Sequence, residues 1–272
     1  MTPRLFGIVN ITEDSFSDGG RHLDAAAAIA AARRLAADGA DAIDLGAAAS
    51  NIAAKPVPPD EEIRRLGPVI AALKADGIAV SVDSFVPETQ RFALRRGVDF
   101  LNDIQGFPEP AVYPELAAAR CRLVVMHAVQ GRGRARRVAV PAERIEARIE
   151  EFFTARIAAL EAAGIVRSRL ILDPGMGFFL SSDAAASLRV LAGLARLKRA
   201  FGLPVMVSVS RKSFLAAVTG RQDPGARGAA TLAAELYAAA RGADFIRTHD
   251  PGALRDGLSV MNGLRAQQRA IR

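Results

Sequence analysis

Polar side chains recur at the points where short apolar runs of this sequence end. The run 170–172 ends at Asp173, and Pro174 and Gly175 then prevent the strand from continuing. The same arrangement places other polar groups at run ends: Asn10, Asp44, Asp83, Asn102, His127, Ser210 with Arg211 and Lys212, and Arg247 with His249. Parallel strands that are buried on both faces read as continuous apolar runs, and α/β folds keep their chemistry at the carboxyl ends of such strands. We therefore expect these side chains to share one end of a parallel sheet.

The types of these residues suggest the kind of ligand that they bind. Asp83, Asn102 and Asp173 supply carboxylate and amide groups, without the His and Cys pattern of a structural zinc site. Such groups suit a flat heterocycle that is rich in hydrogen-bond donors, such as a pterin or a guanine-like ring.

A second set of residues suggests anions. Arg247, His249 and Asn10, together with hydroxyl groups in the first loop, can surround a phosphate or a diphosphate. Lys212 and Ser213 stand where an apolar run enters a helical region, so exposed backbone N–H groups there could hold a second anion, such as a carboxylate. A phosphorylated substrate is therefore expected.

These residues need a scaffold that brings distant run ends together. The sequence predicts eight strands, at 5–10, 42–46, 79–83, 100–104, 122–127, 169–173, 204–210 and 244–249. Helical segments are expected between them, at 24–39, 60–77, 87–97, 110–120, 141–163 and 183–201, then in a broken region to 241 and in a last helix to 268. Right-handed crossovers would close such a series into a parallel barrel. We predict an α/β fold, a single (β/α)8 TIM barrel domain over residues 1–272.

Composition limits the classes of function. Of the 272 residues, 50% are apolar, so a large core can form, and no apolar run approaches the ~20 residues that span a bilayer. The N-terminus does not resemble a signal peptide and Cys121 is the one cysteine, so we expect a cytoplasmic protein without a membrane partner. The net charge of +7 is compatible with nucleic acid, an anionic substrate or a basic surface. Trp is absent and the basic residues are dispersed, so we expect no nucleic-acid partner.

Seven motifs carry a resemblance to a known family, and they span residues 5–250. The segments 7–20, 82–84, 102–104, 126–127, 173–178, 210–213 and 246–250 resemble, in order, the motif series of dihydropteroate synthase. That resemblance implies condensation of 6-hydroxymethyl-7,8-dihydropterin diphosphate with p-aminobenzoate, in which the diphosphate leaves first and the aniline nitrogen then attacks the exocyclic methylene. It also implies a homodimer that forms through helices of the last three units.

The resemblance also implies roles for individual residues. Lys212, Arg247 and His249 would be catalytic. The pterin would be bound by Asp83, Asn102, Asp173 and Lys212. The diphosphate would be bound by Asn10, Ser50, Arg247 and His249, with a Mg²⁺ ion at Asn10. The p-aminobenzoate would be bound by Phe178, Phe179 and Ser213.

Two departures from the family pattern concern the p-aminobenzoate pocket. After Gly46 the family usually has a Ser-Thr-Arg-Pro-Gly loop, whereas this chain has Ala-Ser-Asn-Ile-Ala-Ala-Lys-Pro at 49–56. After Phe178 the family usually has Gly-Lys, whereas this chain has Phe179-Leu180. Both changes resemble the mobile sulfonamide-resistance versions of the enzyme. They imply that the chain is sulfonamide-insensitive, with the ring of Phe179 crowding the drug.

Two other interpretations remain open. A methyltetrahydrofolate-dependent methyltransferase with a corrinoid partner is another pterin-binding barrel and would share Asp83, Asn102 and Asp173. A non-catalytic pterin-binding paralogue would keep the barrel and lack turnover. The motif at 210–213 and the first loop favour the diphosphate substrate over the methyltransferase, and diphosphate release on mixing both substrates would separate the enzyme from the paralogue.

Overall fold

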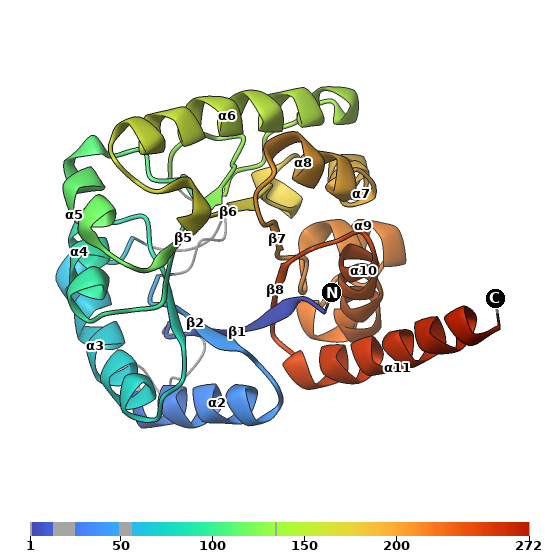
Figure 1. The fold of residues 1–272 in the computed structure, drawn as a ribbon, viewed down its shortest axis with the longest axis horizontal. Coiled ribbons are helices and arrows are strands. Elements are labelled where there is room, and N and C mark those ends of the chain that lie inside the picture. Colours follow the sequence, from blue (N-terminus) through green and yellow to red (C-terminus); the bar gives the residue numbers. More distant parts are fainter. Residues whose placement is uncertain (1, 13–24, 49–55, 134, 272) are drawn as a thin grey trace.

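The computed structural model of the chain describes residues 2–12, 25–48, 56–133 and 135–271. Ser50, Asp24 and most of the motif at 7–20 lie outside the described residues. Eight parallel strands form one sheet: β1 (Arg4–Asn10), β2 (Ala42–Gly46), β3 (Val80–Asp83), β4 (Phe100–Asp103), β5 (Arg122–Met126), β6 (Leu170–Asp173), β7 (Met206–Val207) and β8 (Phe245–Thr248). Their order is β6-β5-β4-β3-β2-β1-β8-β7. A parallel bridge between Leu172 and Val205 joins the two ends of this series, so the sheet closes (Figure 1).

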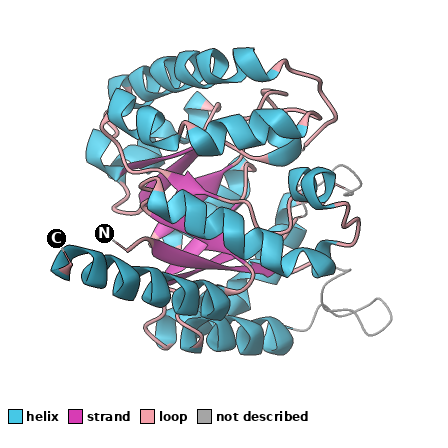
Figure 2. Ribbon diagram, turned by 90° about the vertical axis from the view of Figure 1, so that its right-hand side faces the viewer, coloured by secondary structure: helices cyan, strands magenta, loops and turns pink. Residues whose placement is uncertain are grey.

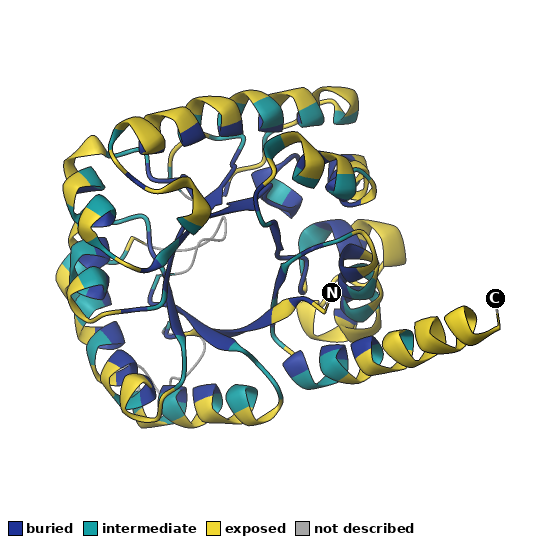
Figure 3. Cartoon of the chain, in the orientation of Figure 1, coloured by how far each residue is buried: buried dark blue, intermediate teal, exposed yellow. Residues whose placement is uncertain are grey.

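Helices surround the closed sheet, as the side view shows (Figure 2). They are α2 (Ala25–Ala37), α3 (Pro59–Ala75), α4 (Pro87–Arg95), α5 (Tyr113–Ala118), α6 (Ala142–Ala162), α7 (Ala184–Ala192), α8 (Leu194–Phe201), α9 (Ser213–Thr219), α10 (Gly228–Ala240) and α11 (Pro251–Ala270). Their buried faces are turned to the strands and their exposed faces to the outside (Figure 3). This arrangement is the (β/α)8 TIM barrel that the alternation of apolar runs and helical segments predicts.

Two elements differ from the expectation. The predicted strand 204–210 contains only two residues in β7, because Ser208 and the residues after it turn toward the mouth of the barrel. The predicted helix 183–201 is two helices, α7 and α8, with Gly193 as the C-cap of the first. Asp183 does cap α7, since its side chain accepts a hydrogen bond from the Ala185 N–H at 2.9 Å.

The inside of the barrel is packed with side chains and is not a channel. Phe6, Phe100 and Phe245 meet edge to face, with ring centroids 4.7–6.2 Å apart. They belong to a buried layer with Ala42, Val124, Ile171 and Met206, near the amino ends of the strands. This layer therefore closes the barrel near the amino ends of the strands.

Strand register sets the height of the polar residues at the carboxyl ends. Asn10 is paired with Gly46, Gly46 with Asp83, and Asp83 with Asn102. On the far side of the barrel Asp173 is paired with Met126. The register therefore brings groups that are far apart in sequence to one level at the mouth.

Two further features are the absence of a membrane-spanning helix from the described residues and a buried cysteine. In the described part of the chain no helix is long and apolar enough to cross a membrane. Cys121 is buried and its thiol is free.

Candidate functional site

A cavity at the mouth of the barrel brings together six of the residues that the sequence predicts for the site. Its wall contains the polar side chains Asp83, Asn102, Asp173, Lys212 and Arg247. The apolar part of the wall comes from Ile104, Met126, Met176 and Phe179. Carboxylate, amide and cationic groups thus converge on one small space between apolar walls, which is typical of a small-molecule site.

Arg247 is the centre of a charged network in this cavity. Its Nε donates to Oδ2 of Asp44, and its Nη2 donates to Oδ2 of Asp83 at 2.8 Å. Burial alone would lower the pKa of Arg247, but the two carboxylates outweigh burial and raise it. Arg247 therefore stays charged, and its Nη1 remains without a protein partner in the described part of the chain.

Asp44 is the residue that motif reasoning left without a role. It is fully buried at the centre of β2, two positions before Gly46, and its second oxygen, Oδ1, has no hydrogen-bond partner among the described residues. The signal in the sequence was its position in the apolar run 42–46. A charged residue inside such a run requires a partner, and Arg247 on β8 is that partner.

Asp83 and Asp173 are two buried carboxylates with different neighbours. Burial raises the pKa of Asp83, Arg247 opposes the increase, and the charge of Asp44 adds to it. Burial also raises the pKa of Asp173 to about 6. The Gly175 N–H, which donates to Oδ1 of Asp173 at 2.7 Å, opposes this increase. Asp173 thus has one oxygen held by the backbone and a second oxygen available to a ligand.

The turn after Asp173 can be made only with glycine at 175. Gly175 has a φ of +74°, and a Cβ at this position would collide with the carbonyl oxygen of His127. Pro174 before it ends β6, so the backbone leaves the barrel directly above Asp173. The Asp-Pro-Gly motif therefore fixes the orientation of the carboxylate.

Lys212 enters the cavity from the loop after β7. Its ammonium lies 5.0 Å from the ring centroid of Phe179. Burial and the charge of Arg247 lower the pKa of Lys212 to about 8. The charges of Asp173 and Asp83 oppose this decrease. The preceding residue, Arg211, has a φ of +59°, and the buried guanidinium of Arg227 donates to its carbonyl oxygen at 2.7 Å. Arg227 thereby holds the strained turn that presents Lys212.

Asn102 supplies an unused acceptor in the same cavity. It is 3% exposed, and its Oδ1 has no hydrogen-bond partner in the described residues. A buried amide oxygen without a partner is costly, so its position in a cavity wall points to a donor on a ligand.

Asn10 and His249 lie at the rim of the mouth. Asn10 is exposed at the end of β1, and its Oδ1 lies near Gly46. His249 Nδ1 is 2.8 Å from Oγ of Ser210, which also accepts from the His249 N–H at 3.3 Å. The Ser210 hydroxyl proton is thus free to bond Nδ1, and this leaves Nε2 as an N–H donor. Burial first, and then the nearby cations, lower the pKa of His249 to about 3, so its ring is neutral.

Phe178 and Phe179 follow β6 in different environments. Phe179 is 5% exposed and packs in a cluster with Ile104, Met126 and Ala135. Phe178 is half-buried, and the guanidinium of Arg137 lies 5.6 Å from its ring centroid. The Phe179 side chain therefore supports the cavity wall, and the Phe178 ring is the more accessible of the two.

Ser213 stands beside the same turn. It is the first residue of α9, and a Cβ at Gly177 would lie 3.3 Å from its Oγ. The turn at 177–179, which contains Phe178 and Phe179, thus adjoins the start of α9.

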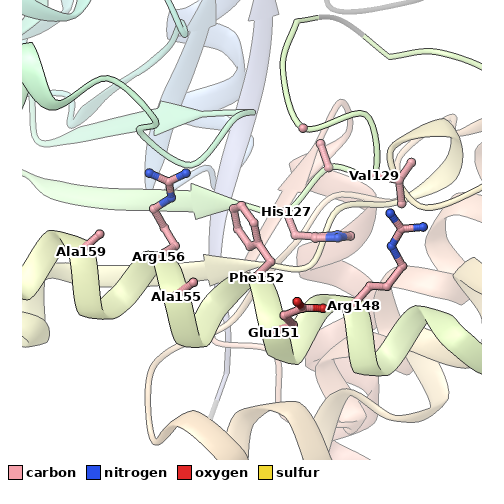
Figure 4. Close-up of a pocket in the computed structure, with 10 residues that line it drawn as sticks. His127, Val129, Arg148, Glu151, Phe152, Ala155, Arg156 and Ala159 are labelled. Atoms are coloured by element: carbon pink, nitrogen blue, oxygen red, sulfur yellow. The ribbon is translucent and has the colours of Figure 1, made fainter.

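His127 is the strand-end residue that does not face the cavity. Side chains alternate along a strand, so Met126 lines the cavity whereas His127 lies behind it, next to α6 (Figure 4). The expectation that all the strand-end groups share one mouth is wrong for this side chain. Its Nδ1 donates to the carbonyl oxygen of Pro174 at 3.1 Å.

Comparison with known proteins agrees with this geometry. The family model for the pterin binding enzymes matches residues 6–249. The type-2 dihydropteroate synthase of Escherichia coli is 62% identical over 265 residues, which cover 97% of this chain and 97% of that protein. The type-3 dihydropteroate synthase of the same organism is 54% identical, over 96% of this chain and 99% of that protein.

A solved structure shows the same fold. The Xanthomonas albilineans dihydropteroate synthase with 4-aminobenzoic acid has a TM-score of 0.89 at 41% identity, over 97% of this chain and 94% of that chain. The chain therefore belongs to the pterin binding enzymes and, among them, to the dihydropteroate synthase family.

Proposed function

We propose that this chain condenses 6-hydroxymethyl-7,8-dihydropterin diphosphate with p-aminobenzoate to 7,8-dihydropteroate and diphosphate. The observation that carries the proposal is the set of acceptors Asp83, Asn102 and Asp173 in one cavity with Lys212. A dihydropteroate synthase of Xanthomonas albilineans has been solved in complex with 7,8-dihydropteroate, the product of this reaction, and it is 40% identical to this chain.

The pterin would lie in the cavity with its donor edge toward the buried acceptors. The free oxygen of Asp173 and Oδ1 of Asn102 would accept from the amino group and ring N–H of the pterin. Lys212 would donate to a ring acceptor while its ammonium remains over Phe179. Buried carboxylates on this side also favour the positive charge that develops on the pterin when the diphosphate leaves.

The diphosphate would lie above the pterin, against Arg247, His249 and Asn10. Arg247 Nη1 has no partner among the described residues, and the neutral His249 presents Nε2–H, so both can donate to departing oxygens. Ser50 would complete this part of the site. As the carbon–oxygen bond breaks, these donors stabilise the negative charge, and the aniline nitrogen then forms the new carbon–nitrogen bond and loses a proton.

A Mg²⁺ ion fits this arrangement. Among the described residues no three His, Cys, Asp or Glu side chains come together to hold a metal. Mg²⁺ usually keeps several waters and binds substrate phosphates with one or two protein oxygens, and the exposed Oδ1 of Asn10 can be such an oxygen. When bound, the ion would neutralise charge on the diphosphate.

The p-aminobenzoate would lie between Phe178 and Ser213, and the chain would be insensitive to sulfonamides. Phe179 adds a ring where the family usually has glycine, in a cluster against which Phe178 packs. A sulfonamide carries a tetrahedral sulfur with a further substituent, so a narrowed wall can admit the flat carboxylate and clash with the drug.

The chain would also form a homodimer through helices of the last three units. Several apolar side chains on these helices are exposed, among them Val260 at 63%, Leu264 at 60% and Val218 at 57%. The C-terminal half of α11 extends away from the barrel (Figure 1). Light scattering at micromolar concentration should give twice the mass of one chain.

Titration calorimetry tests the pterin site. Asp173→Ala and Asp83→Ala should each abolish measurable pterin binding, because a charge-assisted hydrogen bond contributes about 1.5–3 kcal/mol. Asp76→Ala removes an exposed carboxylate from the ion pair with Arg33 and should leave the affinity unchanged. Unchanged affinity in either cavity variant would contradict the assignment.

Diphosphate release on mixing both substrates separates the enzyme from the other interpretations. A non-catalytic paralogue would release none, and a methyltransferase, which transfers a methyl group from methyltetrahydrofolate, would release none either. Release should require a divalent ion and should be slowed by Arg247→Ala. Full activity in the presence of a chelator would contradict the role of Mg²⁺.

A further inference from the structure

A second hollow of about 560 Å³ lies outside the barrel mouth, between α6 and the loop that follows β5 (Figure 4). One face of α6 supplies Arg148, Phe152, Ala155 and Arg156, and the loop supplies His127 and Val129. Its size is that of a site for a drug-sized molecule. It is separate from the cavity at the mouth, with which it shares no lining residue.

His127 gives this hollow a specific chemical requirement. The side chain is buried, with 3% exposure, and Figure 4 shows its ring directed along the hollow toward Arg148. A carbonyl oxygen can only accept, so Nδ1 must carry the proton that bonds Pro174. Burial lowers the pKa of His127 to about 4, and the ring is therefore neutral at pH 7. Its Nε2 is then an acceptor, and it has no partner in the described part of the chain.

Charge defines the other end of the hollow. Arg148 is exposed and makes no ion pair with any described residue. Arg156 is already occupied, since its Nη1 donates to the carbonyl oxygen of Phe107 at 2.8 Å. Glu151 is the one acidic residue of the lining, so two cations and one carboxylate leave the hollow with net positive charge.

The space between these groups suits a flat ring. Phe152 forms one side, with its ring centroid 5.3 Å from that of His127 at an interplanar angle of 72°. Ala155 has a small side chain on the adjacent turn of α6 and leaves room next to the Phe152 ring. An aromatic ligand could pack against Phe152 and reach both His127 and Arg148.

We propose that this hollow is a second ligand site, which binds a small aromatic carboxylate that carries a hydroxyl or amino donor. The donor bonds Nε2 of His127, the ring packs on Phe152, and the carboxylate pairs with Arg148. Nothing in the proposed reaction uses these three groups.

The same residues connect the hollow to the mouth of the barrel. The His127 N–H donates to the Asp173 carbonyl oxygen at 2.8 Å, and the Val129 N–H donates to the Phe179 carbonyl oxygen at 2.9 Å. Gly175 packs against the His127 backbone so closely that no Cβ fits. A ligand bound to His127 therefore affects the position of the turn that orients Asp173. Binding at the two sites is coupled in this way.

Imidazole NMR tests the proposal directly, because the chain has only three histidines. The probes are 3-hydroxybenzoate and 4-hydroxybenzoate, with benzoate lacking the donor and 4-hydroxybenzamide lacking the charge. A hydroxybenzoate should shift the Nε2 signal of His127, together with the Gly175 and Phe179 amides. Arg148→Ala should raise the Kd that this shift reports at least tenfold, which is about 1.4 kcal/mol.

Variants and controls separate this site from the barrel mouth. Ala155→Leu fills the hollow at an exposed helical position and should also remove binding, whereas Arg199→Ala on α8 should not change the Kd. Turnover without the probe should be unchanged in all three variants. The proposal would be overturned by a His127 signal that does not move or by a Kd that Arg148→Ala leaves the same. It would also be overturned if benzoate or 4-hydroxybenzamide bound as tightly as 4-hydroxybenzoate. Shifts at His249 alone would place the probe at the mouth and would overturn it too.

Discussion

Asp44→Asn removes one of the two carboxylates that hold Arg247 while keeping the shape of the side chain. Asp44 is fully buried and its carboxylate accepts directly from Nε of Arg247. Asp83 remains 2.8 Å from Nη2, so the guanidinium keeps one anionic partner. We expect the variant to fold, to lose stability, and to let Arg247 move toward Asp83.

The size of the effect follows from these contacts. Removing one partner of a buried ion pair costs about 3–5 kcal/mol when the other charge is left alone. Here a second carboxylate remains, so the loss should be nearer one charged hydrogen bond, about 2 kcal/mol. At about 2.1 cal/mol/K per residue, the 272 residues give an unfolding entropy of about 0.57 kcal/mol/K. The Tm should therefore fall by about 3–4 °C.

Differential scanning calorimetry measures this change against a matched control. Asp76→Asn alters the exposed pair with Arg33, whose side chains are 32% and 55% exposed, and should shift Tm by less than about 2 °C. Asp44→Asn should also lower kcat/KM, because a displaced Arg247 would make weaker hydrogen bonds to the diphosphate. Equal Tm shifts in the two variants would refute the view that the buried network organises the mouth.

Three further predictions concern single side chains. Burial and Arg247 lower the pKa of Lys212 to about 8, so kcat/KM should fall as the pH rises through about 8 and Lys212 loses its charge. Lys212→Arg should abolish that pH dependence, and its persistence would assign it to another group. Burial raises the pKa of Glu235 from 4.5 to about 8, so the folded state binds the extra proton and stability should decrease by up to about 1.4 kcal/mol per pH unit between these values. Urea unfolding of Glu235→Gln should lack this slope, and an unchanged slope would contradict the assignment. Phe179→Gly should restore sulfonamide inhibition and keep p-aminobenzoate turnover within about tenfold, or about 1.4 kcal/mol. An unchanged inhibition constant would indicate that the loop 47–56, and not Phe179, determines the selectivity.

The strand ends were predictable because burial on both faces leaves a clear signal. The run that ends at Asp173 and the run that ends at Asp83 are apolar up to the carboxylate, and both carboxylates line the cavity. The Asp-Pro-Gly turn was equally readable, since Pro174 and Gly175 act through local backbone geometry. What depends on local pattern could be derived from the sequence.

Features that depend on distant partners could not be derived in this way. The ion pair of Asp44 with Arg247 joins residues 203 positions apart, and no local pattern indicates it. The direction of His127 depends on where β5 ends, because one residue more or less reverses the face. The burial of Phe179 likewise depends on packing with Ile104 and Met126, which are distant in sequence.

The short strand β7 makes one seam of the barrel weaker than the others. It contains two residues, and in the described part of the chain β6 is joined to it through the bridge between Leu172 and Val205 and the hydrogen bond from the Leu172 N–H to the Pro204 carbonyl oxygen. Backbone amides near this seam should exchange with deuterium through local opening, at a lower free energy than those between β1 and β2. Asp173 and Lys212 stand on opposite sides of the seam, so its opening would widen the cavity at the mouth without unfolding the barrel.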